Sequence, residues 1–150
     1  MGLDRLRASL RSHSLVALDT SIFIYQLDLN QRYFVLSDAI FAWLGQRGKS
    51  AVCSTLSLTE LLVPAYQEGN DRRIEAYYGL LSTFPNLTWV PPDLQIADKV
   101  AHLRATYRLK TPDAIQAATA IHSNATAFLT NDSGFKRVKN LNSLALDDFL

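Results

Sequence analysis

Short runs of apolar residues alternate along the chain with longer segments in which apolar residues recur at helical spacing. A short apolar run bounded by polar residues is typical of a strand that is buried on both faces, as in a parallel sheet. Strands that alternate with helices imply right-handed crossovers and a mostly parallel sheet. The pattern therefore predicts an α/β fold in which helices flank a central sheet. The predicted strands cover Leu15–Leu18, Ala51–Ser54, Leu87–Val90, Ala127–Thr130 and Ser143–Leu146.

Helical periodicity and helix-start signals fill the segments between these strands. Residues 1–14 are basic and polar and are predicted to form a helical turn before the first strand. Pro64 is expected to kink or end the helix that contains it, because proline cannot donate a backbone hydrogen bond. No repeat or linker interrupts the pattern, so a single domain over residues 1–150 is expected. The predicted helices cover Thr20–Asp28, Tyr33–Gln46, a segment from near Ser57, Asp71–Phe84, a segment from Asp93 and a segment from Thr111.

Composition narrows the class of protein. Hydrophobic residues make up 48% of the chain and charged residues 19%, which is normal for a globular domain and excludes disorder. The net charge of +1 means that any nucleic-acid site must be local. The single cysteine, Cys53, excludes an internal disulfide and a zinc site built from cysteines. No signal peptide or membrane span is evident, so a cytoplasmic protein is expected.

Acidic residues stand where predicted strands have just ended or where a helix begins. Asp19 follows the first strand, Glu60 lies after the second, Asp113 is in the first turn of a helix, and Asp132 lies after the fourth strand. Each has a local explanation. Asp19 can cap the next helix, Ser57 and Glu60 can form a capping box, Asp113 favours the helix dipole, and Asp132 can form an Asx turn.

Taken together, the four carboxylates indicate more than helix capping. Successive strands of a parallel sheet end at the same edge, so these side chains can converge. Carboxylates in one pocket raise each other's pKa unless a cation neutralises them. An all-oxygen cluster selects a hard cation, Mg²⁺ or Mn²⁺, and such an ion can polarise a phosphoryl group and activate a water molecule. The residues thus point to metal-dependent hydrolysis of a phosphodiester or phosphomonoester.

The chain resembles the PIN-domain nucleases, particularly the VapC-type toxins of bacterial and archaeal toxin–antitoxin pairs. The resemblance implies a five-stranded parallel sheet and a Mg²⁺-dependent endoribonuclease that hydrolyses RNA. It places the metal-binding and catalytic acids at Asp19, Glu60, Asp113 and Asp132, with Thr130 as a supporting hydroxyl. The stretches that carry the resemblance are Leu18-Asp-Thr-Ser-Ile22, Leu58-Thr-Glu-Leu-Leu62, Thr111-Pro-Asp-Ala-Ile-Gln-Ala-Ala-Thr-Ala120 and Leu129-Thr-Asn-Asp-Ser-Gly-Phe135.

The chain departs from the pattern of the resembling family at two positions. Ser21 stands where many relatives have Asn, so its contact to the site is expected to be short or water-mediated. Pro64 follows soon after Glu60 and leaves the direction of the Glu60 carboxylate open.

Two surfaces are candidates for partners. Lys136, Arg137 and Lys139 follow Asp132 and could contact RNA phosphates, although a solvated basic loop explains them equally well. The segment Tyr33–Leu36 with Ile40, Phe41 and Trp43, and the pairs Tyr77-Tyr78 and Leu80-Leu81, are more apolar than surface helices need. The resemblance makes an antitoxin segment and a homodimer mate the candidate partners for this surface, and core packing is the alternative.

Other functions fit the same residues less well. A catalytically silent binding module would use the acids only as helix caps, and it would not respond to Mg²⁺ or Mn²⁺. A phosphatase of the haloacid dehalogenase type also begins with an Asp at a strand end. That class needs a second Asp two residues later, where this chain has Ser21.

Overall fold

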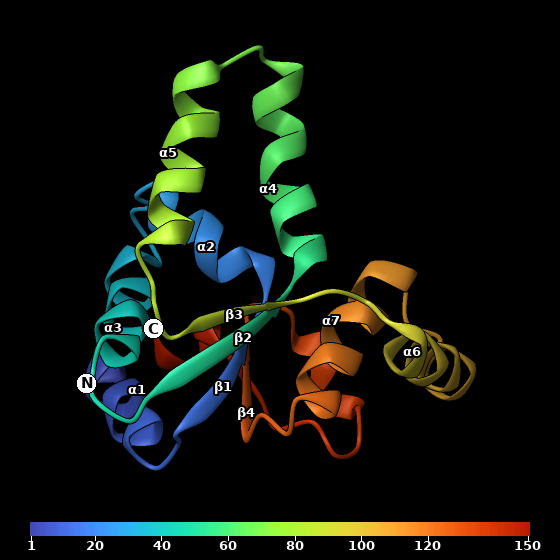
Figure 1. The fold of residues 1–150 in the computed structure, drawn as a ribbon. Coiled ribbons are helices and arrows are strands. Elements are labelled where there is room, and N and C mark those ends of the chain that lie inside the picture. Colours follow the sequence, from blue (N-terminus) through green and yellow to red (C-terminus); the bar gives the residue numbers. More distant parts are fainter.

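Every apolar run predicted as a strand pairs in parallel with its neighbours in the computed structural model, which describes residues 1–150 (Figure 1). The sheet has the order β3-β2-β1-β4-β5, and all four neighbouring pairs are parallel. The predicted α/β class is confirmed. The last strand ends one residue before its predicted end, because Leu146 begins a 3₁₀ turn. The strands are β1 Leu15–Leu18, β2 Ser50–Ser54, β3 Leu87–Val90, β4 Ala127–Thr130 and β5 Ser143–Ala145.

Helices cover both faces of the sheet (Figure 1). One face packs against α1 to α5, and the other packs against α6 and α7. The helices are α1 Gly2–Arg11, α2 Thr20–Leu27, α3 Phe34–Leu44, α4 Thr55–Gln67, α5 Asp71–Ser82, α6 Leu94–Tyr107 and α7 Thr111–His122, with two 3₁₀ segments, η1 Ser133–Arg137 and η2 Leu146–Phe149.

The central strand β1 shows why apolar and polar residues do not alternate in the runs that form the strands. Val16 and Leu18 of β1 lie in the core against α1 to α5, whereas Ala17 lies in the core against α6 and α7. Successive side chains of a strand point to opposite faces, so a strand covered on both sides must be apolar throughout. Both cores are therefore set by the same short runs.

The N-terminal segment departs from the sequence prediction. Residues 2–11 form a full helix, α1, rather than a single turn. Leu6 and Leu10 are fully buried in the core that α3 also lines. The Arg5 guanidinium donates to the Asp148 carbonyl at 2.7 Å, which joins α1 to η2. Tertiary packing thus stabilises a full helix where the mostly polar sequence predicted only a helical turn.

Pro64 does not end its helix. It lies inside α4, which continues to Gln67. Proline lacks the backbone N–H, so the carbonyl of Glu60 four residues earlier has no helical partner. Packing of Leu61, Leu62 and Ala65 into the core holds the helix together across this missing bond. Of the two predicted effects of Pro64, a kink or an end of the helix, the end was wrong.

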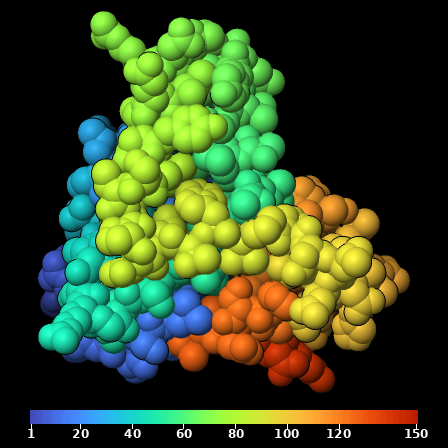
Figure 2. All heavy atoms as spheres, viewed as in Figure 1, coloured from blue at the N-terminus to red at the C-terminus, as the bar shows by residue number.

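The helices α4 and α5 form a hairpin that projects away from the sheet (Figures 1 and 2). Most of the apolar residues predicted as a partner surface are core residues. Leu36, Ile40, Phe41, Trp43, Tyr77 and Leu81 are buried. Val35 and Tyr78 are exposed. None of the helices is long and apolar enough to cross a membrane.

Candidate active site

The order of strands reverses at β1, since the chain passes from β1 to β2 and β3 on one side and then to β4 and β5 on the other. Ligands of open parallel sheets bind in the crevice at such a reversal, outside the carboxyl ends of the strands. Asp19 and Asp132 both lie at this point. Asp19 follows β1 directly, and Asp132 lies two residues beyond the end of β4. The topology therefore brings two predicted acids to the same point at the edge of the sheet.

Thr130 links these two acids. Its hydroxyl donates to Asp19 Oδ2 at 2.7 Å, and its Oγ1 accepts from the backbone N–H of Asp132 at 3.1 Å. Asp19 Oδ1 accepts from the backbone N–H of Thr20 at 2.8 Å, as the N-cap of α2. Both oxygens of the half-buried Asp19 are thus fixed. The hydroxyl predicted to support the site holds one of its carboxylates in place.

Glu60 reaches the site from the adjacent helix. It lies on an exposed part of α4, yet its Oε1 accepts from the hydroxyl of Thr20 at 2.8 Å. The Nε2 of Gln116, on α7, lies 3.4 Å from the same oxygen and 3.0 Å from Ser57 Oγ. Thr20, Ser57 and Gln116 are all buried. A buried polar network between α2, α4 and α7 therefore determines where the Glu60 carboxylate lies.

Asp113 approaches from α7. It is half-buried in the first turn of that helix, and no hydrogen bond holds either of its oxygens. It lines a cavity of about 190 Å³ together with Asp132. Asp132 Oδ1 accepts from the backbone N–H of Gly134 at 2.8 Å, the predicted Asx turn. A side chain at Gly134 would place its Cβ 3.0 Å from that oxygen, so a glycine suits this turn.

The carboxylates influence one another electrostatically. Burial, together with the charges of Glu60 and Asp113, raises the pKa of Asp19 to about 6, although bonds from Thr130 and Thr20 oppose the shift. Burial and the charges of Asp132 and Glu60 also raise the pKa of Asp113, against the opposing effect of Lys110. None of the four acids forms an ion pair within the protein. Each carboxylate thus lacks an ion-pair partner in the protein, although Lys110 lies close enough to oppose the pKa shift of Asp113.

The donor set fits a hard divalent cation, because it consists of carboxylate and hydroxyl oxygens only. The side chains as they stand do not bring three or more acidic, His or Cys groups close enough to hold an ion together. Hydrogen bonds explain the spacing in part, since Glu60 is tethered to Thr20 and Asp132 to Gly134. Mutual repulsion acts in the same direction. Ser21 Oγ, two residues from Asp19, is buried without a hydrogen-bond partner.

The three predicted RNA-binding cations lie in different surroundings. Lys136 pairs with Asp148 at 2.8 Å, and Lys139 lines a separate cavity beside Tyr107. Arg137 lines the cavity that contains Asp113 and Asp132. Only one member of the basic run is therefore placed beside the acids.

The network around Gln116 was not predicted from the sequence. The Ser57-to-Glu60 spacing predicted a capping box, but Ser54 is the N-cap of α4 and accepts from the backbone N–H of Leu56. Ser57 lies inside the helix and contacts Thr20 instead. A glutamine among the alanines of α7 was the available signal, since a polar residue in a buried stripe requires partners.

The strand order and the helical layers on both faces define a doubly wound parallel α/β protein, with acidic side chains at the strand reversal. A family model described as "PIN domain" matches residues 16–141. The chain therefore belongs to the PIN-domain family, as the sequence resemblance predicted. No curated protein sequence matches the chain.

Solved structures share the fold at low sequence identity. VapBC2 from Rickettsia felis, bound to a DNA fragment from its promoter, matches with a TM-score of 0.69 and 18% identity over 87% of this chain and 98% of that one. VapBC-1 from nontypeable Haemophilus influenzae matches with a TM-score of 0.69 and 21% identity over 89% and 98%. A toxin–antitoxin complex from Klebsiella pneumoniae matches with a TM-score of 0.66 and 21% identity over 87% and 97%. These likenesses establish the fold.

Replacing Gln116 by Leu tests the polar network. Leucine keeps the volume but removes the amide that lies beside Thr20, Ser57 and Glu60. We expect the catalytic rate of any nuclease activity to fall roughly 10-fold, with little change in KM or melting temperature, because groups that orient ligands matter to this extent. Thr119→Val on the same helix is the control, since the Thr119 hydroxyl bonds only to the Ile115 carbonyl. Equal rates for both variants would exclude a positioning role for Gln116.

Proposed function

We propose that the protein is a divalent-metal-dependent endoribonuclease, the toxin of a VapC-type toxin–antitoxin pair. The observation that carries the proposal is the group of four carboxylates at the strand reversal. Burial, and to a smaller extent the acidic neighbours, raise the pKa values of Asp19 and Asp113. Membership of the PIN-domain family supports the proposal. Mg²⁺ is the expected cofactor and Mn²⁺ the substitute, since both prefer oxygen ligands.

Asp19, Glu60, Asp113 and Asp132 are the residues that would hold the ion. A bound divalent ion supplies positive charge that polarises a phosphodiester and lowers the pKa of water. The protein fixes Asp19 through Thr20 and Thr130. One oxygen each of Glu60 and Asp132, and both oxygens of Asp113, have no hydrogen-bond partner in the protein. These oxygens are free to bind a ligand or to accept a proton from water.

Partners follow from the structural neighbours, which are VapBC or toxin–antitoxin complexes. They support a cognate antitoxin as the protein partner, and we also propose a homodimer. Tyr78 and Leu81, two residues of the predicted partner surface, line an apolar cavity of about 440 Å³ with Phe84, Leu87 and Trp89. An exposed apolar cavity of this kind suits an apolar segment of a partner.

Addition of Mg²⁺ or Mn²⁺ tests the proposal directly. At a concentration about 100 times the dissociation constant, binding adds about 2.7 kcal/mol to the free energy of unfolding. We therefore expect the melting temperature to rise by roughly 5–10 °C, and single-stranded RNA to be cleaved only when the ion is present. Differential scanning fluorimetry and gel analysis of a labelled RNA measure the two effects.

The variant Asp113→Asn should lose both responses, with RNA cleavage reduced roughly 100-fold for a loss of about 3 kcal/mol in the transition state. Asp98→Asn is the matched control, because Asp98 is an exposed acid of α6 that lines a different cavity. A protein whose melting temperature ignores both ions and whose RNA stays intact would be a silent binding module instead.

A further inference from the structure

The cavity that contains Asp113 and Asp132 is also lined by three cationic side chains. Arg108 and Lys110 come from the turn between α6 and α7, and Arg137 comes from η1 after β4. Of these three, only Arg137 belongs to the basic run Lys136, Arg137 and Lys139 that the sequence predicted as a phosphate contact. The turn before α7 contributes the other two cations, which the sequence does not place beside Asp132 because more than twenty residues separate them.

These cations are not paired. No carboxylate lies within 4.0 Å of Arg108, Lys110 or Arg137, although two carboxylates line the same cavity. The side chains of Arg108 and Lys110 make no hydrogen bond within the protein, and Arg137 donates only through Nε to the Gly134 carbonyl at 3.2 Å. Three positive and two negative side chains leave the cavity with a net charge of +1. Its free hydrogen-bonding capacity therefore includes three cationic donors.

Backbone and side-chain hydrogen bonds hold the turn that carries Arg108. Arg108 closes α6 in the left-handed conformation, with φ 58° and ψ 34°, where a residue with a Cβ costs roughly 1–2 kcal/mol. Its N–H donates to the Arg104 carbonyl at 2.9 Å. Arg104 Nε donates in turn to the Leu109 carbonyl at 3.1 Å, and Leu109 is buried. An arginine thus occupies a position that glycine would fill at lower cost, and it does so at the rim of the acidic site.

We propose that Arg108, Lys110 and Arg137 together bind one backbone phosphate of the RNA, adjacent to the phosphodiester that is cleaved. This inference rests on the proposed nuclease function and adds a phosphate subsite to it. The cavity of about 190 Å³ has room for a phosphate with part of its sugar, since it equals about six waters at about 30 Å³ each. Arginine and lysine are the residues that contact nucleic-acid phosphates. The subsite offsets the repulsion between the acids and the RNA backbone.

Binding without metal separates this subsite from catalysis. The probe is a fluorescein-labelled single-stranded RNA of about 12 nucleotides, held with the full-length protein in EDTA so that no metal-dependent cleavage occurs. For single strands, the logarithm of the binding constant falls with the logarithm of salt concentration by about 0.7 for each phosphate contacted. Fluorescence anisotropy between about 50 and 200 mM salt gives this slope.

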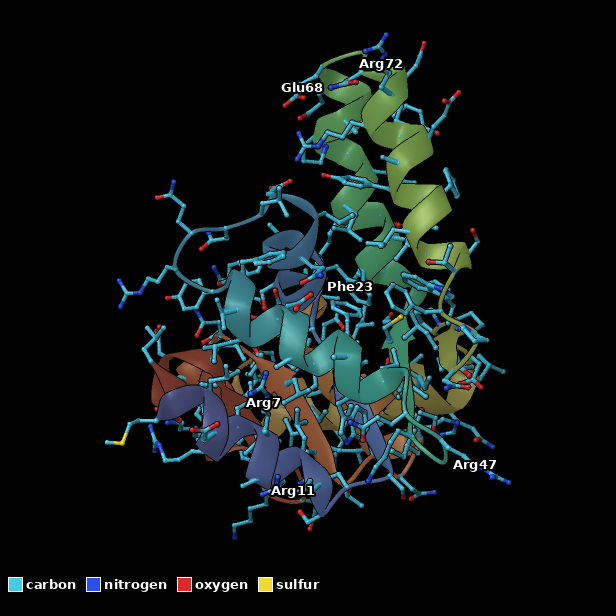
Figure 3. All side chains as sticks on the ribbon, turned by 90° about the vertical axis from the view of Figure 1, so that its left-hand side faces the viewer. Arg7, Arg11, Phe23, Arg47, Glu68 and Arg72 are labelled. Carbon is cyan, nitrogen blue, oxygen red and sulfur yellow. The ribbon has the colours of Figure 1, made fainter.

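We expect the magnitude of the salt slope to be smaller by about 0.7 in the combined variant Arg108→Gly, Lys110→Gln, Arg137→Gln than in the wild type. This difference is the value for a single phosphate. The affinity of the combined variant should fall at least 3-fold at low salt. The matched control removes three other arginines that form no ion pair and do not line this cavity, Arg11→Gln, Arg47→Gln and Arg72→Gln. They lie on α1, after α3 and at the tip of the α4–α5 hairpin (Figure 3). The control should keep the wild-type slope. A decrease of the slope near three times 0.7 would indicate three separate phosphate contacts and would overturn the single-phosphate subsite. A decrease in the control equal to that in the combined variant would overturn it as well.

A second measurement identifies the phosphate. In wild-type protein with Mg²⁺, a neutral methylphosphonate at one position flanking the cleaved bond should slow cleavage roughly 10-fold. In the combined variant Arg108→Gly, Lys110→Gln, Arg137→Gln the same substitution should have little further effect, because the three cations that recognise that charge are missing. Arg108→Gly should melt at or above the wild-type temperature, since glycine relieves the left-handed strain. Additive effects in protein and substrate would contradict the subsite. RNA that binds with the predicted slope but is never cleaved would instead contradict the nuclease function.

Discussion

Asp19→Asn is expected to abolish RNA cleavage and, in the absence of metal, to stabilise the protein at neutral pH. The two effects have one cause. Burial and the charges of Glu60 and Asp113 raise the pKa of Asp19 from 3.8 to about 6, so the ionised carboxylate is disfavoured in the fold. Each pKa unit corresponds to 1.36 kcal/mol, and the penalty amounts to about 3 kcal/mol. An amide of nearly the same shape avoids this penalty, but it lacks the charge that we propose binds a cation.

The pH dependence has a definite sign. The folded state holds the Asp19 proton more tightly than the unfolded chain does, because its pKa is raised. Asp19 therefore favours folding below pH 3.8, and this contribution is lost as the pH rises through about 6. The free energy of unfolding of the wild type in EDTA, measured by urea titration, should fall relative to that of Asp19→Asn across this interval. Above it, the difference should be constant at about 3 kcal/mol.

Metal should reverse the order of stability. With saturating Mg²⁺ or Mn²⁺ the wild type gains binding energy and Asp19→Asn gains little. RNA cleavage by the variant should be at least about 100-fold slower. Asp98→Asn makes the same change in charge on an exposed helix and should change neither the pH profile nor the cleavage rate. If Asp19→Asn were less stable than wild type in EDTA at neutral pH, the carboxylate would be a stabilising helix cap rather than a strained member of an acidic site.

Elements that depend on local chemistry were predictable from the sequence. β1 and β4 are runs of apolar residues that end at polar ones, and their limits were predicted without error. The helix α1 was underestimated because its stability comes from burial of Leu6 and Leu10 against distant segments. The continuation of α4 past Pro64 has the same origin. In both cases long-range packing outweighed a local signal.

The candidate site also contains some features that local sequence predicts and others that depend on tertiary packing. The acids at the strand ends could be found because a parallel sheet places strand ends together, and each follows a recognisable run. The partner of Glu60 could not be found, since it depends on how α2, α4 and α7 pack and not on spacing within α4. Thr20 and Glu60 are forty residues apart, and Gln116 and Glu60 fifty-six. Local spacing favoured the capping box, whereas the tertiary fold provides the observed network.

Phe23→Ala is expected to have the largest effect on stability. Phe23 is fully buried in α2, and Figure 3 shows it inside the molecule near α3. Its ring centroid lies 5.7 Å from that of Trp89 on β3 and 5.7 Å from that of Phe41 on α3. Removing a buried phenyl group costs about 3–5 kcal/mol through lost transfer energy and an unfilled cavity. This loss is a large part of the 5–15 kcal/mol typical of a domain, and the melting temperature should fall by roughly 10 °C.

The position of Phe23 makes the result informative about function as well. It stands one turn beyond Asp19 and Thr20 in the helix that begins at the site, so the aromatic contacts help to hold the N-terminus of α2 against the sheet. Phe23→Leu keeps most of the volume and should cost less than about 1.5 kcal/mol. Tyr78→Ala removes an exposed aromatic ring and should change stability by no more than about 0.5 kcal/mol. Phe23→Leu could lose RNA cleavage although its free energy of unfolding falls by no more than this amount. Phe23 would then determine the orientation of α2 in addition to stabilising the core. Calorimetry and cleavage assays on the three variants, at temperatures where each is folded, separate these two contributions.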